Sequence, residues 1–141
     1  MASAATKALG TTISIDATPI GSLSSIGGVE ITADEIDATN HDSALGFRER
    51  ITGLLDTGAL EISGQYVNAD TGQAALMTAS GASTGTPTAA AFIITYPDFS
   101  TISFDAVITR IVPVGEATVD GLLTFSATLR PTGAVSDPFG A

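Results

Sequence analysis

The sequence contains no cysteine and no tryptophan. The first absence excludes disulfide bonds and thiolate nucleophiles, and it leaves the redox compartment of the protein open. Aromatic residues make up only 6% of the chain, so a core has to be built from Ile, Leu, Val and Ala with six Phe. Sugar-binding modules usually stack their ligands on exposed aromatic rings. The two tyrosines, Tyr66 and Tyr96, fall on apolar faces of expected strands. A generic β-sandwich module for adhesion or carbohydrate binding therefore remains an alternative with little support.

Charge is also scarce, and basic charge above all. Charged residues are 14% of the chain, against roughly 25% in an average domain. Fifteen acidic residues against five basic ones give a net charge of −10, which argues against binding phosphate groups or nucleic acid. Arg48 and Arg50 are the one place where two bases lie close in sequence. Surfaces with few charges are typical of contacts between proteins.

Long hydrophobic runs are missing. The densest apolar stretch, "AAAFII", is far too short to cross a bilayer, and "MASAATKALG" lacks the continuous apolar core of a signal peptide. We therefore expect synthesis in the cytoplasm and no membrane association. A length of 141 residues fits one domain over residues 1–141, with a flexible N-terminal arm over 1–10 and an extended C-terminal tail over 131–141.

The residues that are present alternate between apolar and polar over most of the chain, which is the pattern of half-buried strands. The last three strands follow one another directly and predict an antiparallel meander. We expect a mainly β fold, a β-sandwich or barrel-like domain with a long polar loop at about residues 34–55. The expected strands cover residues 11–20, 29–34, 59–66, 89–97, 101–112 and 122–130.

One helix is predicted, over about residues 70–80. The segment "DTGQAALMTASG" is rich in good helix formers. Asp70 lies three residues before Gln73, which is the spacing of an N-cap residue and its reciprocal partner. Gly81 is placed to end the helix.

The triplet Asp56-Thr57-Gly58 lies in "LLDTGAL", which is close to the catalytic loop of retroviral-type aspartic proteases. Such enzymes need two carboxylates that share a site. A second triplet begins at Asp70, but it is too near in sequence to form the other half, so only a homodimeric protease would be possible. Asp-Thr-Gly is also common turn chemistry. We interpret the triplet as a turn and keep the homodimeric protease as an alternative.

The loop "DEIDATNHDS" gathers oxygen and imidazole ligands that could hold a cation. Its spacing matches no known metal-binding loop, and a solvated loop is the simpler interpretation. We expect no metal, no cofactor and no catalytic residue.

The order of several short motifs resembles the major tail tube protein of long-tailed, non-contractile (siphovirus-type) bacteriophages. The matching segments are "EIDATNHDS", "FRERITGLLDTGALEISGQY", "NADTGQAAL", "FIITYPDFSTISFDAVITRIV" and "DGLLTFSATLRPTG". They extend over about residues 10–135, and their order carries more weight than any single motif.

This resemblance implies a structural virion protein, not an enzyme. Six copies would form a ring, and stacked rings would form the hollow phage tail tube. The tape-measure protein and DNA pass through its lumen, without specific binding of the DNA, and tail terminator and tip proteins complete the tube. An acidic wall would repel phosphates. The expected lumen-facing residues, which would otherwise face bulk solvent, are Glu61, Ser63, Gln65, Ser103 and Asp105. The expected contacts between subunits or rings are Asp34, Glu35, Asp37, His41, Asp42, Phe47, Arg48 and Arg50.

Overall fold

The structure is a computed structural model that describes residues 7–42, 44–136 and 138–139. Within these residues the chain forms nine strands, one α-helix and a short 3-10 turn, so the prediction of a mainly β fold with one helix is confirmed. In chain order the elements are β1 (Thr12–Ile15), β2 (Thr18–Pro19), β3 (Leu23–Ile26), β4 (Ile31–Asp37), η1 (Ala44–Gly46), β5 (Arg50–Thr57), β6 (Leu60–Gln65), α1 (Thr71–Ala79), β7 (Ala90–Thr95), β8 (Thr101–Val112) and β9 (Thr124–Thr132).

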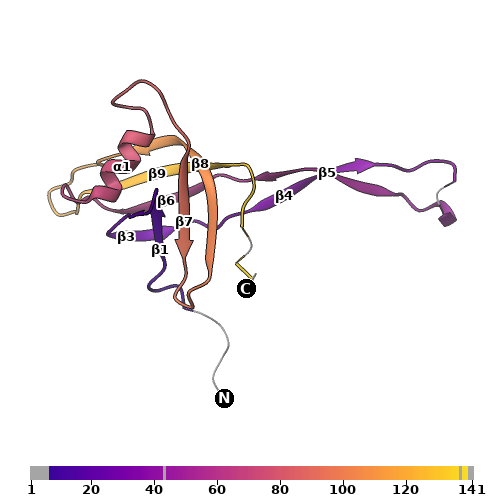
Figure 1. Cartoon of the computed structure of the whole chain (residues 1–141), viewed down its shortest axis with the longest axis horizontal. Helices are drawn as coiled ribbons and strands as arrows, with labels where there is room; N and C mark the ends of the chain where they lie inside the picture. The colour runs from indigo at the N-terminus through magenta and orange to yellow at the C-terminus, as the bar shows by residue number, and fades with distance from the viewer. Residues whose placement is uncertain (1–6, 43, 137, 140–141) are drawn as a thin grey trace, which may run out of the picture.

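Seven strands form one antiparallel sheet in the order β2-β1-β7-β8-β9-β6-β3. The predicted meander of β7, β8 and β9 lies at its centre. β8 is twelve residues long, and its register with β9 shifts between Ile108 and Arg110. Bulges increase the local twist of a strand. Figure 1 shows β8 curving so that β1 and β7 run across the direction of β9 and β6. The sheet therefore folds over on itself and encloses a core.

The core is lined by the apolar residues of each alternating strand. On β6, Leu60 and Ile62 point inward while Glu61 is exposed. Phe92 of β7 and Phe104 of β8 stack at the centre, with ring centroids 5.8 Å apart. Offset stacking of this kind adds about 0.5–1.5 kcal/mol to the burial of the rings. The largest fully buried side chains are Phe92, Ile13, Ile15, Ile62, Leu76, Ile94 and Leu129.

The helix packs over this core through Gly72, Leu76 and Ala79. Asp70 is its N-cap residue, and the Asp70 carboxylate accepts a hydrogen bond from the Gln73 backbone N–H at 3.2 Å. The same oxygen accepts from the Gly21 N–H at 3.0 Å, which ties the helix to the chain after β2. The Gln73 side chain bonds Val67 N–H, not the Asp70 N–H of a reciprocal cap. Gly81 adopts φ +79° directly after the C-cap, where glycine is favoured.

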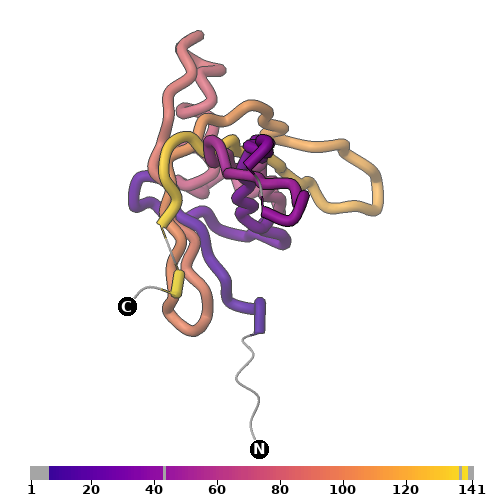
Figure 2. Tube along the Cα trace, turned by 90° about the vertical axis from the view of Figure 1, so that its right-hand side faces the viewer, coloured from indigo at the N-terminus to yellow at the C-terminus, as the bar shows by residue number. Residues whose placement is uncertain are grey.

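The polar segment 34–55 is not a long loop. It forms most of a two-stranded hairpin, β4 paired with β5, which is a separate sheet. Figure 1 shows this hairpin projecting far from the body, and Figure 2 looks along it from its tip. The alternation that marks a strand was missing because neither face of the hairpin is buried and because a bulge interrupts its register between Ala33 and Glu35.

Other boundaries also differ from the expectation. The predicted strand over 11–20 is two strands, β1 and β2, joined by a tight turn in which Asp16 and Ala17 both have positive φ. The C-terminal tail begins later than residue 131, because β9 continues to Thr132. Beyond it the chain bends back, and Ser136 exchanges hydrogen bonds with the backbone of Ser103 at 2.7 and 3.0 Å. Residues 1–6 of the expected arm and residues 137 and 140–141 of the tail lie outside the described residues.

Within the described chain no helix is long and apolar enough to cross a membrane.

Candidate functional site

The triplet Asp56-Thr57-Gly58 is not a turn, which corrects the interpretation of its sequence. Asp56 and Thr57 are the last residues of β5, and Gly58 has no positive φ. Gly58 N–H donates to Glu30 O at 3.0 Å, so the pairing of the two chain segments continues through it. Asp and Gly are common in turns, but here backbone hydrogen bonds to β4 and to Glu30 keep the triplet extended.

The carboxylates of the two triplets have separate partners. Asp56 is exposed and pairs with Arg130 of β9, with Nη2 and Oδ2 3.4 Å apart. Asp70 is occupied by the helix cap and Gly21. The chain therefore does not bring the two carboxylates into one site. Among the described residues, no group of three or more His, Cys, Asp or Glu side chains is placed to hold a metal ion.

The hairpin carries every residue that was expected to contact other subunits. Asp34, Glu35 and Asp37 lie on β4. Arg50 begins β5. The remaining four lie in the tip between the strands and are His41, Asp42, Phe47 and Arg48. All eight residues are exposed.

Both arginines of the hairpin have partners within it. Arg50 forms an ion pair with Glu35, and Arg48 Nη1 lies 3.3 Å from Asp37 Oδ2. Asp37 also accepts the Thr39 N–H at 2.9 Å, and hydrogen bonds from Thr39 lower the pKa of the Asp37 carboxyl, with a smaller contribution from Arg48. Solvent screens exposed pairs like these, so they add little to stability. They orient the arginines along the hairpin but leave them open to another molecule.

Apart from Phe47, the apolar residues of the hairpin were not among the expected contacts. Ile36 and Ile51 lie opposite each other across the two strands, and both are exposed. Leu54 and Leu55 are exposed on β5, Leu54 to 84%. Clusters of exposed apolar side chains mark contact sites more reliably than scattered ones. The β-branched residues in "EITADEID" and "RITGLL" could have indicated the two strands of the hairpin, because such residues favour strands.

The expected lumen-facing residues share the outer face of the seven-stranded sheet. Glu61, Ser63 and Gln65 lie directly opposite Thr128, Ser126 and Thr124 of β9. Asp105 lies opposite Thr132 near the other end of β9. Ser103 precedes Asp105 by two residues, so it lies on the same face, and it pairs with Ile93 of β7. The face carries both signs of charge: besides Glu61 and Asp105 it holds exposed Arg130 of β9 and Arg110 of β8, which lies opposite Thr128.

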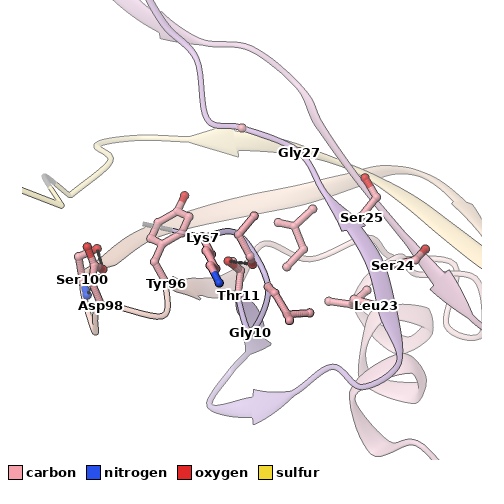
Figure 3. Close-up of a pocket in the computed structure, with 14 residues that line it drawn as sticks. Lys7, Gly10, Thr11, Leu23, Ser24, Ser25, Gly27, Tyr96, Asp98 and Ser100 are labelled. Atoms are coloured by element: carbon pink, nitrogen blue, oxygen red, sulfur yellow. Dashed lines mark hydrogen bonds between the residues drawn. The ribbon is translucent and has the colours of Figure 1, made fainter. Parts of the chain in front are cut away.

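Two hollows open on the surface of the body. The first, of about 480 Å³, lies between the N-terminal residues 7–11, β3 and the β7–β8 turn, and is lined by Leu23, Ile26 and Tyr96 among others (Figure 3). The second, of about 490 Å³, lies where the hairpin leaves the body. Its apolar lining comes from Ile31, Leu55, Pro131 and Val135.

Comparison with known proteins gives no match among protein-family models and none among curated proteins. Solved structures do match. A chain from the tail of an empty gene transfer agent (GTA) particle with C6 symmetry has a TM-score of 0.71 and 21% identity, over 94% of this chain and 98% of that one. A chain from the sheath/tube terminator of an extracellular contractile injection system (PVC) has a TM-score of 0.74 and 12% identity, over 96% and 98%.

A third match, from the baseplate of the anti-feeding prophage (AFP), covers 99% of both chains with a TM-score of 0.72 and 13% identity. At such low identities these likenesses establish the fold, which extends over nearly the whole length of each chain. The matches extend over 94–99% of this chain, in which the hairpin occupies residues 31–57.

Proposed function

We propose that this chain is a structural subunit of the tail tube of a bacteriophage or a phage-like particle. Six copies form a ring, and rings stack into a hollow tube. The observation that carries the proposal is the fold, which is shared end to end with a chain from a C6-symmetric particle tail. The acidic, weakly charged composition and the exposed apolar hairpin support the same conclusion.

The finer assignment is to the long-tailed, non-contractile type, and it rests on the motif order in the sequence. In such a particle the tube would lie in the virion tail, deliver DNA to the host without binding it specifically, and contain the tape-measure protein before ejection. Terminator and tip proteins would contact its two ends. The matched structures from contractile systems do not carry this distinction.

The test of the proposal is electron microscopy of the purified protein across a range of concentrations. Rings or long tubes with an axial hole are the expected result. A protein that stays monomeric at high concentration, as measured by light scattering, would overturn the proposal. Particles without a central hole would do the same.

The hairpin is proposed as the arm that reaches a neighbouring ring. A lone two-stranded hairpin is marginally stable in water, and this one exposes Ile36, Ile51 and Leu54. The contact surface consists of Phe47 and of the polar and charged residues Asp34, Glu35, Asp37, His41, Asp42, Arg48 and Arg50.

A charge swap separates contacts within the hairpin from contacts between subunits. Arg50→Glu breaks the pair with Glu35, whereas Arg50→Glu with Glu35→Arg restores it in reverse order. If the pair only supports the hairpin, the double variant assembles normally. If Arg50 meets an acidic neighbour, both variants fold but fail to form tubes. If the single and double variants both form normal tubes, Arg50 does not take part in the contact between subunits.

The outer sheet face with Glu61, Ser63, Gln65, Ser103 and Asp105 is proposed as the wall of the lumen. The chain has no cysteine, so Ser63→Cys can be labelled without background. In assembled tubes a bulky polymer maleimide should leave this position unlabelled, while Thr84→Cys, in an exposed loop, should react. Equal labelling of both positions would place this face on the outside of the tube.

A further inference from the structure

The turn between β7 and β8 holds a large apolar residue in a strained and exposed position. Tyr96 N–H donates to Ser100 O and Phe99 N–H donates to Tyr96 O, both at 2.9 Å. This is a type I turn followed by a bulge residue in the left-handed region, a place where glycine is the usual choice. Here it is Phe99, with φ +69°. Its side chain is 87% exposed.

Among the residues that the structure describes, Phe99 gains no burial that would offset this conformation. The left-handed region disfavours residues with a Cβ, and an exposed ring gains little from burial. The turn is nevertheless held firmly, because Asp98 Oδ1 accepts from the Ser100 N–H at 3.1 Å and from its hydroxyl at 2.6 Å. Asn or Gly would fit the same backbone without strain. The aromatic ring is therefore presented outward on a rigid support.

We propose that Phe99 is an anchor for a second copy of this chain, and that the hollow at the base of that copy's hairpin receives it. The inference rests on the proposed function, in which each subunit meets identical neighbours. A strained backbone conformation persists where the residue has a function that requires it, and aromatic side chains buried in pockets are among the main contributors to the energy of protein interfaces.

The hollow at the hairpin base has the properties that an aromatic anchor needs. Ile31 and Leu55 line it and are exposed in the free chain, Leu55 to 71%. Pro131 and Val135 complete its apolar wall. The volume of about 490 Å³ is ample for one aromatic ring. The Asp56–Arg130 ion pair lies at its edge, so the charges nearby are already matched.

Symmetry favours this hollow over the other one. A ring or a filament requires a heterologous contact, in which the donor and the receiver are different surfaces of the subunit. The hollow in Figure 3 is lined by Tyr96, Asp98 and Ser100, which belong to the same turn as Phe99. The hairpin base lies elsewhere, since Figure 2 shows the hairpin toward the viewer and the β7–β8 turn directed downward from the body.

The first test removes the anchor without harming the fold. Phe99→Asn should leave the urea midpoint of the free subunit unchanged or raised, because Asn tolerates positive φ. Assembly should weaken, with the critical concentration for rings or tubes raised about tenfold or more. Val119→Asn is the matched control, since Val119 is fully exposed in the β8–β9 loop without positive φ. Unchanged assembly of Phe99→Asn would overturn the inference, as would an equal loss in the control.

The second test identifies the receiving surface. A photoreactive benzoyl-phenylalanine at position 99 keeps an aromatic anchor and should crosslink to residues 54–57 or 131–135 of another copy, as mapped by mass spectrometry of assembled protein. Crosslinks to residues 23–28 or to the hairpin tip would overturn the assignment of the receiver while the proposed tube function stands. A wild-type protein that never assembles would overturn both proposals at once.

Discussion

The body and the hairpin of this molecule use the same antiparallel pairing but are supported in different ways. Every long strand of the body buries one face, as β6 and β9 do with Leu60, Ile62 and Leu129. In β4 all seven residues are exposed. Stability in the body comes from apolar area removed from water, at roughly 25 cal/mol per Å². The described part of the hairpin is held by its ladder, by side-chain hydrogen bonds such as those of Thr39, by two exposed ion pairs and by the cross-strand pair of Ile36 and Ile51.

This difference supports the proposal that another copy of the chain covers the hairpin. Regions with few buried contacts open at low free energy even when the rest of a protein is stable. A binding partner that covers Ile36, Ile51 and Leu54 would supply what the free subunit lacks. In this proposal the body is stabilised by its own core, whereas the hairpin gains its stability from contacts in the assembly.

The largest change in the free energy of unfolding is expected when a leucine is replaced by alanine in the body, and the same replacement in the hairpin serves as the comparison. Leu129 is 0% exposed and Leu54 is 84% exposed. Leu129→Ala should lower the free energy of unfolding by about 2–5 kcal/mol through lost burial and a cavity. Leu54→Ala should change it by no more than about 0.5 kcal/mol. Urea unfolding followed by circular dichroism measures both, and similar losses would show that the hairpin is part of the cooperative core.

A smaller effect is expected where the helix is fastened to the body. Asp70→Ala removes acceptors for the Gln73 and Gly21 N–H groups, and we expect a loss of about 1–2 kcal/mol. Asp70→Asn keeps a side-chain oxygen at the cap and should retain most of the stability. Thermal unfolding of the two variants checks this. An equal loss in both would mean that the charge of Asp70, and not its hydrogen bonds, holds the helix.

The body could be predicted from its sequence because burial imprints a pattern on it. Phe125, Ala127 and Leu129 alternate with Ser126 and Thr128, so β9 was evident. The helix followed from Asp70 and Gly81, whose roles depend on local backbone geometry. Local signals of this kind need no knowledge of distant parts of the chain.

The hairpin could not be predicted in the same way. Its strands bury neither face, so the period-2 signal is absent even though Ile31 and Ile51 favour strands. The Asp56-Thr57-Gly58 triplet was taken as a turn because the pairing with β4 depends on residues some 25 positions earlier. Ring contacts and lumen-facing residues remain proposals, because they depend on neighbouring copies that one chain does not contain.

Shortening the hairpin should leave the body almost unaffected. Replacing residues 34–54 with Asn-Gly joins the paired residues Ala33 and Leu55 by a two-residue turn. The ion pair of Asp56 with Arg130 and the buried Thr57 remain. We expect the free energy of unfolding to change by about 1 kcal/mol or less, while tubes no longer form. A variant that unfolds would show that the hairpin supports the body, and normal tubes would remove it from the ring contacts.

The smallest effect concerns protonation of Asp37 at the end of β4. Hydrogen bonds from Thr39, and to a lesser degree Arg48, lower the pKa of this carboxyl in the folded chain. Its contribution to the order of the hairpin tip is therefore present above the pKa of the unfolded chain, about 3.9, and is lost as the pH falls through the lowered value. NMR titration should show the Thr39 amide shifting with the Asp37 carboxyl in this acidic range. Asp37→Asn should abolish the titration of the Thr39 amide, while the response of the β9 amides to pH should be the same in the variant and in the wild type. If the response of β9 changes in Asp37→Asn, the two regions are coupled more tightly than their packing indicates.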